Sequence, residues 1–215
     1  MDVDTTSGKW AHTEILDRVA RGEVDILLGT QMIAKGLDFP DVTLVGVVSC
    51  DTGLFVPDYR AAERTFQLLS QVAGRADKPG TVVFQTYCPD NYAVAAAAKL
   101  DYDAFVQKEL QFRKQTGYPP YSRLIRVLAE ARTEAEARTV LQAAVAPMRS
   151  MVDLEVLGPA PSVIAKVKDR WRWHMLAKCF QPASFAAAMQ ALGTVEDRGT
   201  RTCRVTLDVD PGSLM

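Results

Sequence analysis

The first part of the chain alternates amphipathic helical patterns with short apolar runs. Residues 9–21 place their apolar side chains on one helical stripe, and 60–76 carry a second stripe opposite a polar face. Three β-branched runs lie at 24–28, 42–48 and 81–87. Runs this apolar, separated by helical patterns, predict strands of a parallel sheet that is buried on both faces. We therefore expect an α/β unit, although three strands would make a thin and incomplete sheet.

The second part of the chain has a different pattern. A helical stretch at about 91–116 ends at GYPPY, residues 117–121, where two prolines stop any helix. The elements then predicted are a strand, a helix, a strand or strand pair, a strand, a helix and a strand, at 122–129, 133–146, 154–168, 171–178, 183–193 and 203–209. That order is the ferredoxin-like, or split βαβ, arrangement. We expect an α/β domain at 1–94, a helical connector at 95–120 and an α+β domain at 121–215.

Composition and charge limit the possible classes of protein. The 215 residues are 48% hydrophobic and 24% charged, which is ordinary for a soluble protein, and the net charge of −1 leaves nucleic-acid binding to local patches. No apolar run approaches the roughly 20 residues that span a bilayer, and the acidic, polar start is not a secretory signal. The four cysteines form no C-x-x-C pair, so we expect reduced thiols, no metal site and a cytoplasmic protein.

Polar side chains cluster directly after the first apolar run, in GTQMIAKGLDFP at 29–40. Ligands of open α/β sheets bind at the carboxyl ends of the strands, so Thr30, Gln31, Lys35 and Asp38 should project from the functional edge. Thr30 and the glycine amides could hold phosphate oxygens, while Lys35 adds charge and Asp38 binds a ribose hydroxyl or positions a cation. The alternative is an ordinary βα loop with a capped helix.

A second polar group ends the second amphipathic helix, in QVAGRA at 71–76. Gln71, Gly74 and Arg75 lie within one helical turn, and the guanidinium fork of an arginine matches phosphate oxygens. One arginine in a turn is a weak signal alone. The two stretches in this order and at this separation favour a nucleotide site.

These stretches and their surroundings resemble the primosomal replication-restart helicases, a family of the superfamily-two nucleic-acid helicases. The matching segments are ILLGTQMIAKGLDFPDVTLV, PDYRAAERTFQLLSQVAGRA, TVVFQTYCPD, FRKQTGYPPYSRL, LGPAP, DRWRW and LDVDP. They cover essentially the whole chain. The resemblance implies a partial RecA-like second motor lobe, followed by a small C-terminal domain that resembles a ribosomal-protein fold and helps to bind branched DNA.

The resemblance also implies a function and a set of site residues. The function is that of an ATP-dependent 3′-to-5′ DNA helicase, nucleoid-associated, which restarts stalled forks and initiates primosome assembly. ATP and Mg²⁺ would be its cofactors, and single-stranded DNA, forked DNA and primosome proteins its partners. The nucleotide-binding residues, from the family's fifth and sixth motifs, would be Gly29, Thr30, Gly36, Asp38, Gln71 and Gly74. Arg75 would be catalytic, and Lys35 would contact DNA.

The sequence departs from the family pattern in two places. The sixth motif ordinarily runs Gln-x-x-Gly-Arg-x-Gly-Arg, whereas here Arg75-Ala76 leads directly to Asp77. The missing second arginine is expected to reach the γ-phosphate. The sequence also contains no G-x-x-x-x-G-K-S/T loop with a following acidic box, and none of the family's zinc ligands. We expect the C-terminal portion of a longer helicase, inactive alone; the alternative is a non-catalytic DNA-binding or primosome-assembly module.

Basic and aromatic residues alternate in KVKDRWRWHMLAK, at 166–178. On a strand, Trp171 and Trp173 share one face, and Arg170 and Arg172 share the other. Aromatic faces stack on unpaired bases while cations hold the backbone, so these four residues are expected to bind DNA. The alternative is that the tryptophans cover the helices of the domain while the arginines are solvated.

Overall fold

The structure, a computed structural model, consists of two compact units. It describes residues 11–30, 42–74, 80–193 and 202–214. The first unit comprises Met1–Val56 and Ala61–Lys108, and the second comprises Pro57–Arg60 and Glu109–Met215. The later division falls inside the connector expected from the sequence. The sequence gives no sign that four residues near position 58 go with the second unit.

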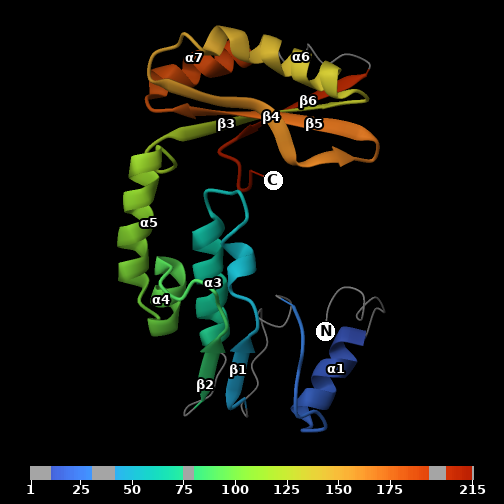
Figure 1. Ribbon diagram of the computed structural model, residues 1–215, viewed down its shortest axis with the longest axis vertical. Coiled ribbons are helices and arrows are strands. Elements are labelled where there is room, and N and C mark those ends of the chain that lie inside the picture. Colours follow the sequence, from blue (N-terminus) through green and yellow to red (C-terminus); the bar gives the residue numbers. More distant parts are fainter. Residues whose placement is uncertain (1–10, 31–41, 75–79, 194–201, 215) are drawn as a thin grey trace. The chain divides into compact units, whose positions relative to one another are not determined.

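The first unit contains a short parallel sheet with helices (Figure 1). Its elements are α1 (Ala11–Ala20), β1 (Leu44–Val47), η1 (Asp51–Gly53), α3 (Ala61–Ala73), β2 (Thr81–Phe84), α4 (Tyr92–Lys99) and the first part of α5 (Tyr102–Thr116). β1 pairs with β2 in parallel, with Leu44 opposite Thr81. The core gathers on α3, where Phe66 stacks on Phe105 of α5 with ring centroids 4.1 Å apart. The predicted parallel α/β arrangement is thus present.

The strand predicted at residues 24–28 is wrong, because these described residues form no strand. Ile26 and Leu28 are 78% and 73% exposed. β-branched residues favour strands only where a neighbouring strand and a buried face receive them. The apolar run therefore carried propensity without the contacts that would make it a strand.

The helical stretch predicted at about 91–116 consists of two separate helices, α4 and α5. Leu100 ends α4 in the left-handed region at φ 54°. The side chain of Asp101 then accepts a hydrogen bond from the Ala104 amide at 2.9 Å, which caps the start of α5. An aspartate at an N-cap is a signal that the sequence contained, in LDYDA, and that the helical pattern obscured.

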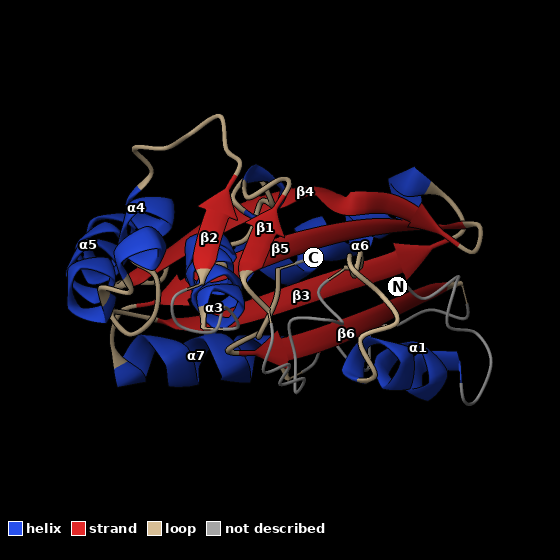
Figure 2. Cartoon of the chain, turned by 90° about the horizontal axis from the view of Figure 1, so that it is seen from below, coloured by secondary structure: helices blue, strands red, loops and turns tan. Residues whose placement is uncertain are grey.

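The second unit has the predicted element order, strand-helix-strand-strand-helix-strand. Its elements are β3 (Arg123–Ala131), α6 (Glu134–Val145), η2 (Ala146–Met148), β4 (Leu154–Val167), β5 (Arg170–Cys179), α7 (Pro182–Leu192) and β6 (Cys203–Val209). The sheet has the order β4-β5-β3-β6, and every neighbouring pair is antiparallel (Figure 2). The mixed α/β class is confirmed: one sheet is parallel and the other antiparallel.

The two faces of the second sheet differ in chemistry. Helices α6 and α7 cover one face, and the C-terminal segment lies on the other side (Figure 1). The helix-covered face holds the core, in which Ile125, Val127 and Met175 are completely buried. Alternate residues of the same strands carry charge to the opposite face, including Arg126 and Lys178. This second face is the polar face of the sheet.

Candidate functional site

Most of the polar loop predicted to bind nucleotide lies outside the described residues. The structure does not describe Gln31, Lys35, Gly36 and Asp38 of this loop, nor Arg75. Their roles therefore stay predictions that follow from the sequence and from the resemblance.

The remaining four nucleotide-site residues lie in two separate segments of the first unit, and all four are exposed. Gly29 and Thr30 are the last described residues of the irregular segment that follows α1. Gln71 is exposed in the last turn of α3, and the amide of Gly74 donates to the carbonyl oxygen of Ser70 at 3.1 Å. Among the described residues, no hydrogen bond joins Gly29 or Thr30 to Gln71 or Gly74. The described parts of the two motifs are not brought together by direct bonds.

A buried carboxylate, Asp51, joins the loops that follow β1 and β2, and the sequence analysis missed it. The Thr86 hydroxyl donates to Asp51 Oδ1 at 2.5 Å, and the Tyr87 amide donates to Oδ2 at 2.9 Å. The bond from Thr86, followed by that from Tyr87, lowers the pKa of Asp51 below its ordinary value. An ionised carboxylate therefore fixes the strand ends at the edge where open α/β sheets bind ligands. An aspartate directly after an apolar run was the available signal.

In the second unit, the two tryptophans of β5 point to the helix-covered face. Trp173 packs against the buried core and lies opposite Ala129 of β3. This placement matches the packing alternative for Trp173. Trp171, opposite Ala131, is half-buried, and the Lys166 ammonium lies 5.8 Å from its ring centroid.

The two arginines of β5 are held by their own sheet. Arg170 Nη2 donates to the carbonyl oxygens of Glu130 at 2.9 Å and of Thr202 at 3.0 Å. Arg172 Nε lies 3.4 Å from Glu130 Oε1. The hydrogen bonds of Arg170 and the ion pair of Arg172 restrain both guanidinium groups, although neither residue is buried.

Positive charge accumulates around β5 on the polar face. Burial lowers the pKa of His174, and Arg126 and Arg172 lower it further, so its imidazole is neutral near pH 7. Burial, and then the charge of Arg172, likewise lower the pKa of Arg126. Arg126 and Arg172 thus lie close enough to His174 to act on its pKa, and such positive charge favours an anion.

The β4–β5 hairpin ends in a two-residue turn at Lys168 and Asp169. Their φ angles are 46° and 59°, and Val167 pairs with Arg170. Two successive positive φ angles define a type I′ turn, which asparagine and glycine adopt most easily. Lysine is an unusual residue at such a position, and here it presents an ammonium at the end of the hairpin.

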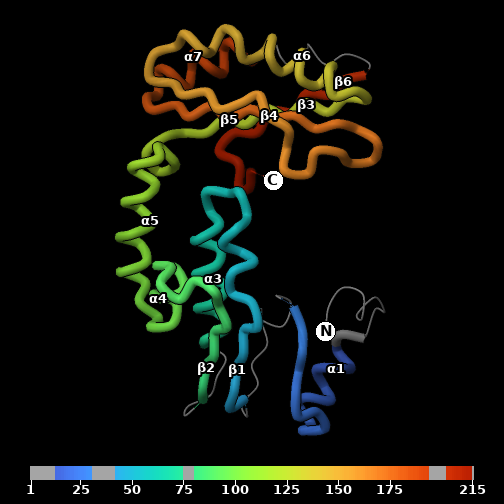
Figure 3. The backbone as a smooth tube through the Cα atoms, viewed as in Figure 1, coloured from blue at the N-terminus to red at the C-terminus, as the bar shows by residue number. Residues whose placement is uncertain are grey.

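An irregular segment of β4 precedes this turn. Pro161 pairs with Trp173 and Lys166 with Trp171, so the residues between Pro161 and Lys166 form a bulge. Figure 3 shows this part of β4 leaving the sheet before it returns to β5. Ile164 of the bulge is 54% exposed, and the side chain of Lys166 is 49% exposed. The hairpin end thus presents the cationic groups that the sequence pattern indicated, together with apolar groups that the sequence analysis did not single out.

The described residues contain neither a cluster of metal ligands nor a membrane-spanning helix. No group of three or more His, Cys, Asp or Glu residues is arranged there to hold a metal ion. None of the helices described is long and apolar enough to cross a bilayer.

Two family models match the chain, one for each unit. Residues 4–80 match the helicase conserved C-terminal domain, and residues 114–212 match the primosomal protein N C-terminal domain. The first match identifies the first unit as part of a RecA-like lobe. The chain is thus classed with the nucleic-acid helicases.

Curated relatives identify the particular family. Over 220 residues the chain is 43% identical to replication restart protein PriA of Bacillus subtilis, covering 100% of this chain and 27% of that protein. It is 40% identical to the protein of the same name from Synechocystis, covering 99% and 26%, and 38% identical to that of Treponema pallidum, covering 99% and 33%. The chain belongs to the PriA family and matches the C-terminal portion of its members. The resemblance inferred from the motifs is confirmed. The chain spans 26% to 33% of the length of these relatives.

Proposed function

We propose that this chain supplies the second motor lobe and the C-terminal DNA-binding domain of an ATP-dependent 3′-to-5′ DNA helicase. This helicase would restart stalled replication forks and initiate primosome assembly, with primosome proteins as partners, in the cytoplasm at the nucleoid. The observation that carries the proposal is the match of the whole chain to relatives named replication restart protein PriA. The match of the first unit to a helicase domain supports the motor role.

The first unit would complete an ATP site from one side. The proposed nucleotide contacts are Gly29, Thr30, Gly36, Asp38, Gln71 and Gly74, with Arg75 at the transferred phosphate and Lys35 on DNA. Bound Mg²⁺ would neutralise phosphate charge. The four of these residues that the structure describes, Gly29, Thr30, Gln71 and Gly74, are all exposed, and none is a carboxylate. We therefore assign these four residues to phosphate and ribose groups.

The second unit would bind single-stranded and forked DNA through the β4–β5 hairpin. Trp171 is available for stacking at its half-buried ring, beside the Lys166 ammonium, and Arg170 and Arg172 add charge on the polar face. Trp173, which the sequence also predicted to stack, would support the site from the core. We assign the unit to the ferredoxin-like, ribosomal-protein-like class because its element order fits that class.

A second candidate function is a non-catalytic DNA-binding or primosome-assembly module. The observation that favours it is the direct passage from Arg75-Ala76 to Asp77, which omits the second arginine of the sixth motif. Both candidates require DNA binding by the second unit. They differ in whether the first unit takes part in ATP turnover.

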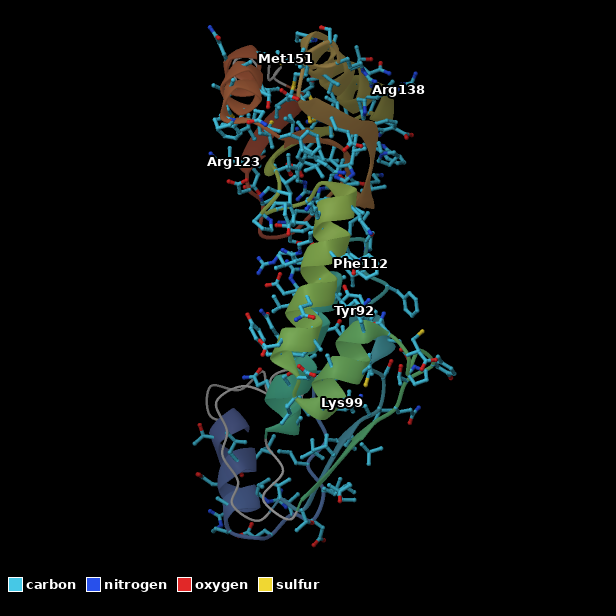
Figure 4. All side chains as sticks on the ribbon, turned by 90° about the vertical axis from the view of Figure 1, so that its left-hand side faces the viewer. Tyr92, Lys99, Phe112, Arg123, Arg138 and Met151 are labelled. Carbon is cyan, nitrogen blue, oxygen red and sulfur yellow. The ribbon has the colours of Figure 1, made fainter. Side chains whose placement is uncertain are left out.

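DNA affinity measured by fluorescence anisotropy over a series of salt concentrations tests the shared part of the proposal. Lys166→Ala should weaken binding of single-stranded DNA and lower the salt dependence by about 1 ion, since one phosphate contact is lost. Trp171→Ala should lose about 1–3 kcal/mol if one base stacks there. Arg138→Ala is the matched control, because Arg138 lies exposed on α6 (Figure 4). Equal affinity of all four proteins would exclude the hairpin as the DNA site.

A further inference from the structure

The bulge of β4 projects from the second sheet, although β5 holds both of its ends. Residues 162–165 lie between Pro161, which pairs with Trp173, and Lys166, which pairs with Trp171. A bulge leaves its extra residues out of the ladder and bends the strand that contains it, as Figure 3 shows for β4. The first residue of the bulge, Ser162, is only 5% exposed. The bulge is therefore anchored at its base.

The middle of the bulge and the end of β4 carry exposed aliphatic side chains. Val163 and Ile164 are 50% and 54% exposed, and Val167, which ends β4, is 38% exposed. Single exposed apolar residues are ordinary on protein surfaces, whereas neighbouring ones with a polar rim mark contact sites. These three residues, the bulge patch, all lie within 163–167 and concentrate apolar surface at the hairpin end.

Cationic groups surround the bulge patch. The Lys166 ammonium lies 5.8 Å from the Trp171 ring centroid and 3.2 Å from Asp169 Oδ1, in an ion pair that is exposed and therefore weak. Lys168 is exposed in the turn, and Arg170 begins β5. These three cations outnumber Asp169, the one carboxylate among residues 161–172. A ligand that fits this surface presents apolar faces beside negative charge, as the bases and phosphates of DNA do.

We propose that the bulge patch contacts the terminal base pair at the junction where duplex DNA divides into single strands. Proteins place aliphatic side chains against or between base pairs, whereas single strands stack mainly on aromatic rings. The last base pair of a duplex exposes one apolar face, because it has no stacked neighbour on that side. Trp171 would hold an unpaired base, and Val163 and Ile164 would cover the last pair. The hairpin thereby recognises forked DNA in preference to single strands.

The bulge is also stiff, which favours a flat and rigid ligand. Valine and isoleucine are branched at Cβ and have few rotamers, so they lose little side-chain entropy when they bind. Both ends of the bulge are fixed by pairing to β5. A base pair matches such a surface. An acidic and apolar segment of a protein is the competing occupant, but it would bind a flexible patch as well as a stiff one.

The inference rests on the proposed DNA binding by the second unit and adds the DNA structure that its hairpin recognises. The proposed function requires only that DNA binds. The inference requires, in addition, that loss of the bulge patch lowers the affinity for forked DNA more than the affinity for single strands. Measurements on both kinds of DNA therefore separate the two.

Fluorescence anisotropy of the full chain with labelled single-stranded and forked DNA, at one salt concentration, tests the inference. Val163→Ser combined with Ile164→Ser should weaken binding of forked DNA by about tenfold and of single-stranded DNA by less than about twofold, because two aliphatic side chains lose their contact with the base pair. Val163→Ile combined with Ile164→Val keeps the aliphatic surface and should keep the affinity for forks. Val152→Ser is the matched control, since Val152 is an 80% exposed valine of the same unit outside the hairpin.

A fork with 2-aminopurine in its last base pair reports the contact itself. The emission of this base should change when the unchanged chain binds, and should not change with the serine double variant at a saturating concentration. If the double variant keeps full affinity for forks, or loses affinity for both DNAs equally, the inference is overturned while the proposed function stands. If the unchanged chain binds neither DNA, the proposed function fails and the inference fails with it.

Discussion

The sheets of the two units differ in the apolar surface they leave exposed. In the first unit, Leu44 of β1 and Val83 of β2 are 64% and 50% exposed. In the second unit, Ile125 of β3 and Met175 of β5 are completely buried beneath α6 and α7. Each unit has a core of its own, but among the described residues only the second unit has helices that cover one face of its sheet.

The difference follows from the kind of sheet. Parallel strands occur almost only where helices or further strands cover both faces, whereas an antiparallel sheet tolerates one polar face. The described part of the first unit has two parallel strands and so lacks most of that cover. In the second unit, the unit's own helices α6 and α7 cover the apolar face of the sheet. We infer that the second unit is stable by itself.

The largest expected effect concerns ATP turnover, which depends on the first unit. The 215-residue chain contains no G-x-x-x-x-G-K-S/T loop, so we expect it to hydrolyse no ATP. Joined to a first lobe from a relative, it should gain activity mainly after insertion of Gly-Arg-Gly following Ala76. An arginine at the γ-phosphate contributes about 10³–10⁵-fold. A steady-state ATPase assay with forked DNA measures both. DNA-stimulated turnover by the unmodified, contaminant-free chain would contradict the expectation.

The next effect concerns core truncation. Leu141→Ala removes a completely buried side chain beneath the second sheet and should lower its free energy of unfolding by about 2–5 kcal/mol. Leu44→Ala in the first unit should change stability by about 0.5 kcal/mol or less, because that side chain is mostly exposed. Urea unfolding of chains with Trp10 replaced by phenylalanine would follow the second unit through Trp171 and Trp173. Far-ultraviolet circular dichroism would follow both units. Equal losses from the two variants would remove the contrast between them.

The two units should also respond to pH in different ranges. The pKa of His174 is lowered in the folded second unit, so the unfolded chain takes up the proton first, and stability should fall below about pH 6.5. The pKa of Asp51 is lowered in the folded first unit. Its contribution is therefore present above about pH 3.9 and is lost as the pH falls through the lower folded value. Urea midpoints at pH 7.5, 5.5 and 3.5, with His174→Gln and Asp51→Asn as controls, measure this. The substitutions should remove the respective pH dependences; if neither does, the assignments are wrong.

The smallest effect concerns the hairpin turn of the second unit. Lys168→Asn with Asp169→Gly should stabilise the unit by about 0.5–1 kcal/mol, because both positions have positive φ. The urea midpoint of the second unit would show the gain. Alanine at an exposed position of α6, at Arg138, serves as the neutral comparison. A loss of stability would show that the Lys168 side chain makes a contribution larger than its backbone strain.

The hydrophobic pattern was sufficient to predict the helices and strands of the second unit, but not all those of the first. In β3, α6 and α7 the positions of the apolar residues follow the buried face of the element. The order of the elements could therefore be predicted. The run at 24–28 shows the limit, because strand formation depends on neighbours that the run itself does not encode. The break at Leu100 was encoded, in the capping aspartate that follows it.

The candidate site was predictable in its motifs and much less so in its contacts. Alternation predicts that Trp171 and Trp173 share a face, but it does not predict that Trp173 packs against the core of the unit. The bond between Asp58 and Ser213 joins residues 155 positions apart, and no local pattern predicts such a contact. The same is true of Asp51 and Thr86, 35 positions apart.

The central claim is that DNA binds at the β4–β5 hairpin of the second unit, and the fluorescence of Trp171 tests it most directly. In a chain with Trp10 and Trp173 replaced by phenylalanine, Trp171 is the remaining indole of the three tryptophans. Single-stranded DNA should quench its emission saturably, and salt should reverse the quenching, because stacking and phosphate contacts act together. Unchanged emission at a DNA concentration where anisotropy reports complete binding would contradict the claim.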